Sequence, residues 1–197
     1  MLKSKILLLF VLAACIFGAC KSDPAYDEAA QLAIDDDIIV KQLAANGETA
    51  TKTPEGIYYQ IISKAATPVN PPVKIRDSLD NVFIHFVSRL YTTQVFIDST
   101  ASNTNTTDLD ENTKFIMANA IRGWKIGLAL IQPGDRIRLI VPSTLAYQNR
   151  IVGTVRGAVI TNTPIPANSI LDFDIKLIDV KPVPAPGTTT PTTITSP

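Results

Sequence analysis

Four segments with strand character surround one short segment of helical periodicity, and this order limits the chain to an α+β fold. The strand-like segments either are rich in β-branched and aromatic residues or alternate apolar with polar side chains, and they cover residues 57–62, 82–90, 136–141 and 171–180. Segment 121–130 has the 3.6-residue apolar spacing of a helix and is stopped by Pro133-Gly134. We therefore predict an antiparallel sheet packed against one helix.

A helical prefix precedes these segments. Asp23-Pro24 is typical of a helix start, and Asn46-Gly47 is typical of a helix end. Asp35-Asp36-Asp37 interrupts the Ala, Leu and Ile residues between them and predicts a second short helix over 38–45. Three carboxylates in a row also suggest calcium binding, but consecutive helical residues point in different directions. We prefer to interpret them as a solvated helix start.

The first twenty residues have the pattern of a secretory signal. Lys3 and Lys5 precede the apolar run 6–14, which is shorter than the ~20 residues that span a membrane. Phe-Gly-Ala-Cys20 and Leu-Ala-Ala-Cys15 both resemble the lipobox at which bacterial lipoproteins are cleaved and acylated. Polar residues follow Cys20 directly, which favours lipidation there. We therefore expect a lipid-anchored protein of the bacterial cell envelope.

Cleavage before Cys20 divides the chain into four parts. We expect a signal peptide (1–19), a tether with the helical prefix (20–52), the strand-rich domain (53–181) and a disordered Pro/Thr-rich tail (182–197). Without Lys3 and Lys5 the 18 basic residues fall to 16 against 18 acidic ones, so membrane attachment rests on the lipid.

Composition excludes several classes of function. Equal numbers of basic and acidic residues, 18 each, argue against a nucleic-acid surface. Both cysteines lie in the first twenty residues, and His85 is the single histidine, so we expect no metal site, no cofactor and no cysteine nucleophile. His85 lies in an apolar strand segment and is interpreted as structural. An EF-hand-like start at 108–112 fails because Thr113 and Asn119 replace the required glycine and glutamate.

One ordered set of motifs runs through the strand-rich part. It comprises Val-Phe-Ile-His-Phe (82–86), Phe-Ile-Asp-Ser-Thr (96–100), Phe-Ile-Met (115–117), Ile-Arg-Gly-Trp (121–124), Pro-Gly-Asp-Arg (133–136), Pro-Ser-Thr-Leu-Ala-Tyr (142–147), Ile-Pro (165–166) and Leu-Asp-Phe-Asp (171–174). This order and spacing resemble the FKBP family of peptidyl-prolyl cis-trans isomerases over residues 56–181. The helical prefix ahead of Thr-Pro-x-Gly-Ile-Tyr-Tyr (53–59) is similar to lipoprotein members of that family.

The resemblance implies an FKBP-like sheet of five or six antiparallel strands wrapped around the helix that starts near Ile121. It also implies an apolar substrate pocket with Trp124 as its floor. The Ile121 N–H and the Tyr147 hydroxyl would hold substrate carbonyls, and Asp98 would lie at the pocket edge. The implied walls also include Phe86, Ile97, Phe115, Ala120, Ile165 and Phe173.

The implied partners are proline-containing polypeptides. Rotating an Xaa-Pro bond breaks no covalent bond, so the activity needs no nucleophile, metal or general base. Two functions stay open. One is a prolyl isomerase that assists the folding of exported proteins, and the other is a non-catalytic FKBP-like binding module or chaperone. The oligomeric state also stays open.

Several positions depart from the family pattern. An extra residue at Phe96-Ile97 leaves open which of the two side chains faces the pocket, and the loop 148–164 is longer than usual. The single-residue departures are Phe86 for a usual tyrosine, Ser88 and Gln148 for usual glycines, and Thr113 for a residue that is often aromatic.

Overall fold

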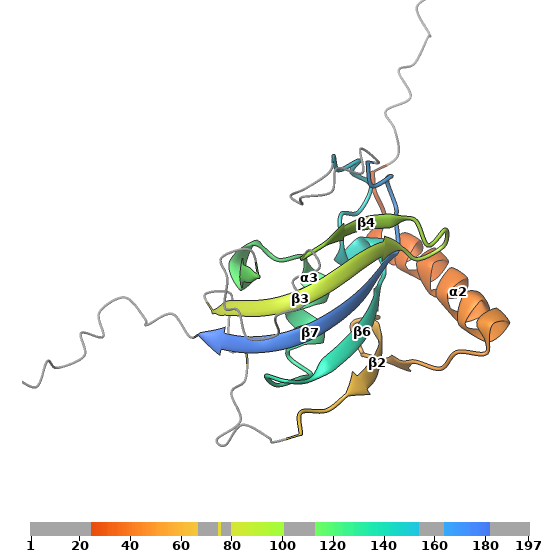
Figure 1. Ribbon diagram of the computed structural model, residues 1–197. Helices are drawn as coiled ribbons and strands as arrows, with labels where there is room; N and C mark the ends of the chain where they lie inside the picture. Colours follow the sequence, from red (N-terminus) through yellow and green to blue (C-terminus); the bar gives the residue numbers. More distant parts are fainter. Residues whose placement is uncertain (1–24, 67–74, 76–79, 101–112, 154–163, 182–197) are drawn as a thin grey trace, which may run out of the picture.

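The computed structural model describes residues 25–66, 75, 80–100, 113–153 and 164–181. The predicted signal peptide, both cysteines and the predicted tail lie outside these ranges. Figure 1 shows the elements, which are α2 (Glu28–Asn46), β1 (Thr51–Lys52), β2 (Tyr58–Ser63), β3 (Asn81–Leu90), β4 (Phe96–Ser99), β5 (Lys114–Ile116), η2 (Met117–Asn119), α3 (Arg122–Leu128), β6 (Arg136–Val141), η3 (Ser143–Leu145) and β7 (Leu171–Lys181).

The strands form one antiparallel sheet in the order β1-β2-β6-β7-β3-β4, and β5 also pairs with β3. The predicted fold class, an FKBP-like sheet with one short helix and a helical prefix, is confirmed. β5 and β4 share the outer edge of β3, one along each half. The sheet therefore has seven strands, more than the five or six that the resemblance implied; three of the seven, β1, β4 and β5, have only two to four residues each.

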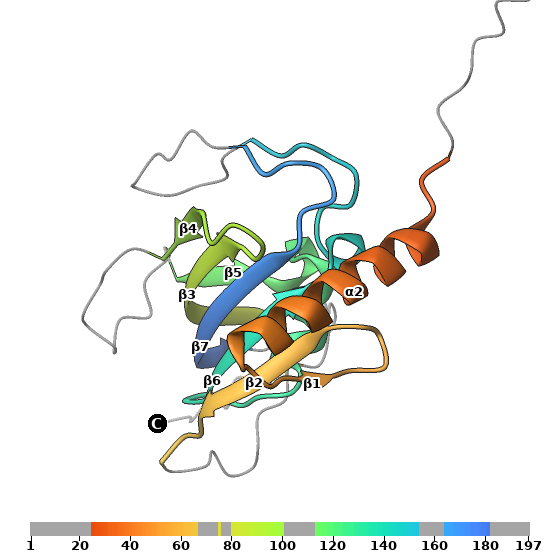
Figure 2. The same cartoon turned by 90° about the vertical axis from the view of Figure 1, so that its right-hand side faces the viewer.

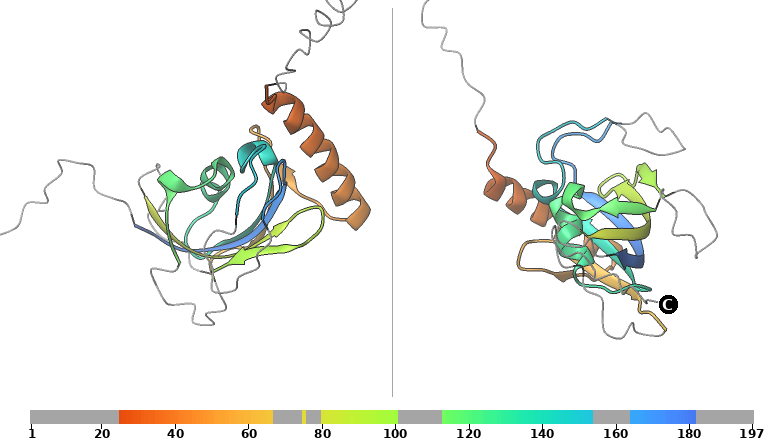
Figure 3. Two further views of the ribbon diagram at one scale, coloured as in Figure 1. Left: turned by 90° about the horizontal axis from the view of Figure 1, so that it is seen from above. Right: turned by 90° about the vertical axis from the view of Figure 1, so that its left-hand side faces the viewer.

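The sheet curves around α3, as the left panel of Figure 3 shows. Its inner face and α3 enclose the main core, whose fully buried members include Ile84, Leu128, Leu139 and Leu177. The inward alternation that the sequence predicts for β7 is present, because Leu171, Phe173, Ile175 and Leu177 are buried at every second position.

The helical prefix packs on the opposite face of the sheet (Figure 2). Ile39 and Leu43 of α2 form a second core with apolar side chains from the sheet and its loops, namely Tyr58, Tyr91, Ile140 and Ile170. Gly47 ends the helix as predicted, in the left-handed conformation (φ 66°) that glycine adopts readily. The N-cap of the described helix is Asp27, and the predicted start at Asp23-Pro24 lies outside the described ranges.

The predicted break at Asp35-Asp36-Asp37 is wrong, because α2 continues through all three residues. Each carboxylate points to a different partner. Asp35 is 1% exposed and accepts hydrogen bonds from Ser143, Asp36 contacts the Tyr58 hydroxyl and the Lys52 ammonium, and Asp37 pairs with Lys41. The helix is thus continuous because tertiary partners satisfy Asp35 and Asp36 and an i,i+4 ion pair satisfies Asp37, and Asp35 is not solvated.

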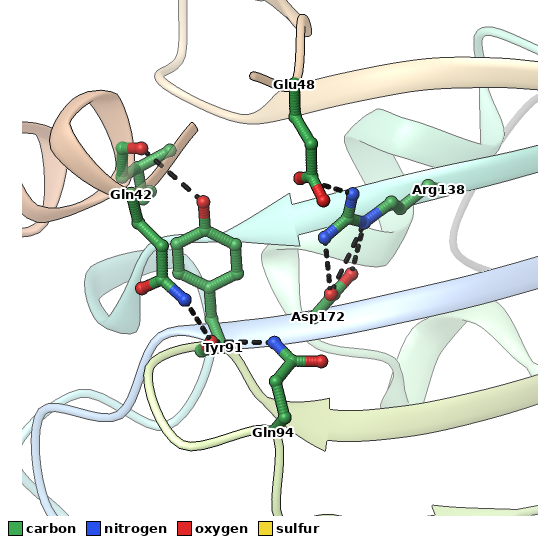
Figure 4. Close-up of polar contacts among 7 residues, drawn as sticks. Gln42, Glu48, Tyr91, Gln94, Arg138 and Asp172 are labelled. Carbon is green, nitrogen blue, oxygen red and sulfur yellow. Dashed lines mark hydrogen bonds and ion pairs between the residues drawn. The ribbon is translucent and has the colours of Figure 1, made fainter. Parts of the chain in front are cut away.

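Polar contacts also attach the C-terminal half of α2 (Figure 4). The Gln42 amide donates to the Tyr91 carbonyl at 3.1 Å, and the Tyr91 hydroxyl donates to the Ile39 carbonyl at 3.4 Å. After the helix, Glu48 and Asp172 share the Arg138 guanidinium at 2.8 and 2.9 Å. The prefix is therefore packed against the domain by apolar and polar contacts, and β1, on the prefix side of the predicted boundary, belongs to the sheet.

Within the described part of the chain, no helix is long and apolar enough to cross a membrane. The same residues contain no group of three His, Cys, Asp or Glu side chains placed to hold a metal ion.

Candidate active site

Trp124 of α3 lies at the centre of three aromatic rings, each from a different strand. Its indole contacts Phe86 of β3, Phe115 of β5 and Phe173 of β7 edge to face, at centroid distances of 5.2, 5.4 and 5.4 Å. Phe86 and Phe115 also meet edge to face, at 5.6 Å. Each such pair stabilises the fold by about 0.5–1.5 kcal/mol in addition to the stabilisation that comes from burying the apolar area of the rings. The cluster therefore forms an apolar, largely buried aromatic group between the sheet and α3.

The structure brings together the apolar residues that the sequence marks as a site. Three of these residues are buried together with Trp124 in the main core. The others are partly exposed and pack against that core. The buried set is Phe86, Phe173 and Ile165, and the partly exposed set is Ile97, Phe115, Ala120, Ile121 and Tyr147. A surface of this kind is suited to an apolar ligand and offers little to a polar one.

Ile121 immediately precedes the first turn of α3. Its carbonyl accepts from the Trp124 and Lys125 amides at 3.1 and 3.3 Å. The hydrogen bonds of the described residues leave the Ile121 N–H without an acceptor, as is usual for the first amides of a helix. The indole N–H of Trp124 is also buried without an acceptor among these residues. The sequence did not point to this second unpaired donor.

Asp98 and Tyr147 provide the polar groups of the site. Burial raises the pKa of the Asp98 carboxyl, and a 2.8 Å hydrogen bond from the Ser99 N–H offsets part of that effect. Burial also raises the pKa of the Tyr147 phenol, and the negative charge of Asp98 raises it further, against the opposing effect of Arg150. The Tyr147 hydroxyl thus stays protonated at neutral pH and remains a hydrogen-bond donor.

The extra residue in the Phe96-Ile97 motif forms a β-bulge. Ser88 pairs with Asp98 and Arg89 with Phe96, so Ile97 has no opposite residue on β3. Ile97 packs against the main core, whereas Phe96 does not belong to that cluster. The structure therefore resolves the alternative that the sequence left open in favour of Ile97.

The other departures also have structural counterparts. Ser88 is 3% exposed and donates its hydroxyl to the Asp98 carbonyl at 3.0 Å, which ties β3 to β4. Gln148 adopts φ 58°, the left-handed conformation for which glycine is the usual residue. Thr113 is buried, and its carbonyl accepts from the Ile84 N–H at 2.9 Å. Part of the long loop, residues 154–163, lies outside the described ranges, and Val152 and Ile165 pair where the loop leaves and returns.

A separate cavity of about 450 Å³ opens between the β1–β2 connection and the end of α3. Its lining residues are Lys52, Thr53, Pro54, Glu55, Tyr59, Ile126, Ala129 and Leu130. No predicted site residue lines it, so it is distinct from the aromatic site.

Comparison with known proteins gives one consistent family. The sequence profile described as FKBP-type peptidyl-prolyl cis-trans isomerase matches residues 74–178. A macrophage infectivity potentiator of Trypanosoma cruzi is 31% identical over 144 residues, which cover 73% of this chain and 62% of that protein. FkpA of Escherichia coli K12, an FKBP-type peptidyl-prolyl cis-trans isomerase, is 32% identical over 131 residues, which cover 66% of this chain and 39% of that protein. The chain thus spans only part of the length of these relatives.

Two solved structures have a similar fold. The crystal structure of Escherichia coli FkpA matches with a TM-score of 0.53 and 28% identity, covering 80% of this chain and 62% of that one. A peptidyl-prolyl cis-trans isomerase from Pseudomonas syringae pv. tomato matches with a TM-score of 0.53 and 23% identity, covering 81% and 98% of the two chains. The second match is informative for the fold alone.

Proposed function

Because the chain belongs to the FKBP-type peptidyl-prolyl cis-trans isomerase family, we propose that it catalyses cis-trans isomerisation of Xaa-Pro bonds in polypeptides. The observation that carries this proposal is the buried Trp124 indole, packed edge to face against Phe86, Phe115 and Phe173. A proline ring is apolar and compact, and an aromatic surface of this kind is complementary to it.

Rotation about the Xaa-Pro bond needs only groups that bind the substrate. Amide resonance gives rotation about the Xaa-Pro bond a barrier of about 20 kcal/mol. The twisted transition state loses that resonance and is less polar than the planar amide. An apolar site therefore favours it relative to water, and each 1.4 kcal/mol or so of this preference gives about tenfold in rate.

Three polar groups have assigned roles in this proposal. The Ile121 N–H, which has no acceptor among the described residues, would hold one substrate carbonyl. The Tyr147 hydroxyl, kept protonated by its raised pKa, would hold another. Asp98 would lie near the amide that rotates. Phe86, Ile97, Phe115, Ala120, Ile165 and Phe173 would surround the prolyl ring above Trp124.

The test is an isomerisation assay on an Ala-Xaa-Pro-Phe peptide, by protease-coupled or NMR exchange measurement, together with binding followed by Trp124 fluorescence. Trp124 is the single tryptophan of the chain, so its emission reports on the site. We expect a fluorescence change and accelerated exchange. A fluorescence change without acceleration would favour the alternative, a non-catalytic FKBP-like binding module. Neither response in the folded protein would contradict the proposed site.

Replacement of Phe86 with tyrosine is expected to raise kcat/KM about fivefold. In the register of β3 and β4, Ser88 is opposite Asp98, so Phe86 lies diagonal to Asp98 on the same face. A hydroxyl at this position would donate to the Asp98 carboxylate, whose own contact is the Ser99 N–H. A hydrogen bond to a charged group contributes about 1.5–3 kcal/mol, and if about 1 kcal/mol of it is felt in the transition state, the rate rises about fivefold.

Two further measurements make the Phe86→Tyr experiment decisive. The new hydrogen bond should lower the pKa of Asp98, which NMR titration would detect. Phe83→Tyr adds the same hydroxyl to the opposite face of β3, under Lys181, and should leave kcat/KM unchanged. An unchanged or lower kcat/KM in a well-folded Phe86→Tyr protein would contradict the assigned role of Asp98.

The proposal places the protein at the bacterial cell envelope, attached through a lipid on Cys20, where it would assist the folding of exported proteins. Support comes from the lipobox-like sequence and the polar residues after Cys20. Cys20→Ala is expected to abolish lipidation and to release the protein from membranes, as intact-mass analysis and fractionation would show. Lipidation that persists in Cys20→Ala and disappears in Cys15→Ala would instead assign the anchor to Cys15.

A further inference from the structure

Asp35 is a buried carboxylate whose hydrogen-bond partners are all uncharged. It is 1% exposed, in the middle of α2. One of its oxygens accepts from the Gln31 amide at 2.8 Å, and the other accepts from the Ser143 N–H at 2.7 Å and the Ser143 hydroxyl at 2.6 Å. Burying a carboxylate is costly unless hydrogen bonds replace its hydration. Here two of the three replacing bonds come from one residue at the start of η3.

Ser143 in turn holds both neighbours of Tyr147. Its carbonyl accepts from the Ala146 N–H at 3.0 Å and from the Gln148 N–H at 2.8 Å. Tyr147 lies between these two amides, so its backbone is fixed relative to Ser143 on both sides. Gln148 needs this support because it is held in a left-handed conformation without being glycine.

A second, weaker link connects the start of α2 to the same region. The side-chain amide of Gln148 donates a 2.7 Å hydrogen bond to the Glu28 carboxylate. The same carboxylate lies 3.5 Å from the guanidinium of Arg122, the residue that follows Ile121. Glu28 is 53% exposed, so these contacts contribute little on their own. Figure 3 (left) shows η3, in teal, beside the N-terminal half of α2. The helix therefore reaches the site by two routes, of which the Asp35 route is buried.

We propose that Asp35 is a positioning residue that sets the Tyr147 hydroxyl through Ser143, so that α2 is a working part of the active site. This inference rests on the proposed function, in which the Tyr147 hydroxyl binds a substrate carbonyl. Asp35 is not the sole attachment of α2, because Ile39 and Leu43 also pack into the second core with Tyr91. Two described α2 carboxylates bond to the segment carrying Tyr147, and of these Asp35 is buried whereas Glu28 is exposed.

The kinetic test compares Asp35→Ala with Asp37→Ala. Asp37 lies two residues away on the same helix, is 61% exposed and pairs with Lys41. We expect kcat/KM to fall about tenfold in Asp35→Ala, with a smaller fall in Asp35→Asn, and to stay unchanged in Asp37→Ala. In a Tyr147→Phe background, Asp35→Ala should cost about twofold or less, because the hydroxyl that it positions is gone. Losses that multiply fully in the double variant would overturn the proposal.

Amide hydrogen exchange tests the same inference without any activity. In Asp35→Ala the Ala146 and Gln148 amides are expected to exchange about tenfold faster, and in Asp37→Ala they should not change. If the wild type does not isomerise peptides, the proposed function fails and exchange alone decides the positioning role. If Asp35→Ala does not fold, Asp35→Asn is measured instead. Unchanged exchange at both amides in a folded Asp35 variant would overturn the proposal.

Discussion

Replacement of Asp135 with asparagine is expected to lower the free energy of unfolding by about 3 kcal/mol at neutral pH. Asp135 follows the Pro133-Gly134 turn and is completely buried. Its carboxylate accepts from the Ala65 N–H at 2.8 Å, the Lys64 ammonium at 2.9 Å and the Gln132 N–H at 3.3 Å. Asparagine keeps one acceptor oxygen and presents an NH₂ group to the remaining donors, which leaves part-buried donors facing another donor.

The stability that Asp135 contributes should depend on pH. Burial by itself would raise the pKa of Asp135, but the hydrogen bonds from Ala65, Lys64 and Gln132 outweigh it and hold the pKa below its usual range. The stability that the ionised group contributes is present above its unfolded pKa of about 3.9 and is lost as pH falls through the folded value. The difference in the free energy of unfolding between wild type and Asp135→Asn should therefore become smaller below about pH 4.

Denaturant unfolding at several pH values checks this expectation, and Asp37→Asn is the matched control. Asp37 is 61% exposed, and its ion-pair partner among the described residues is Lys41 on its own helix, so its replacement should change stability by about 0.5 kcal/mol or less. A difference between wild type and Asp135→Asn that is the same in acid and at neutral pH would show that its charge is not what stabilises the turn.

Local patterns predicted the main strands of the sheet, and the family resemblance implied the apolar part of the site. Strands β6 and β7 follow from alternation, and α3 from helical spacing, because each pattern is long enough to be periodic. The ring contacts of Trp124 join residues from 86 to 173, and the resemblance to the FKBP family implied these residues in advance. What local patterns cannot supply is a partner that lies far along the chain.

The acidic run in α2 illustrates that limit. Asp35 reads locally as a helix break or a solvated cap, since its partner Ser143 is 108 positions away. Asp36 likewise depends on Tyr58, 22 positions away. The short strands β4 and β5 were missed for the same reason, because they are defined by pairing with β3 and not by their own composition.

Replacement of Gly123 with alanine is expected to destabilise the protein by about 2 kcal/mol and to lower its melting temperature by roughly 4–8 °C. Helix α3 approaches β6 so closely that a Cβ on Gly123 would lie 2.4 Å from Cγ1 and 3.0 Å from Cγ2 of Val141. Val141 is fully buried and β-branched, so it has little freedom to turn away. Overpacking destabilises the protein by about 3 kcal/mol, and the higher helical propensity of alanine offsets about 1 kcal/mol of this.

The same close approach sets the position of Trp124 and Ile121, because both are carried by the start of α3. We therefore expect Gly123→Ala to lower kcat/KM on an Xaa-Pro peptide at temperatures where the protein is still folded. Gly153→Ala is the control, since a Cβ there meets no atom of the described residues within 4 Å, and its stability and activity should match those of the wild type. Val141→Ala removes the obstructing methyl groups. Its effect on the free energy of unfolding should be about 1 kcal/mol more favourable in the Gly123→Ala background than in the wild type. A Gly123→Ala protein as stable and active as Gly153→Ala would mean that the contact between α3 and β6 does not set the geometry of the site.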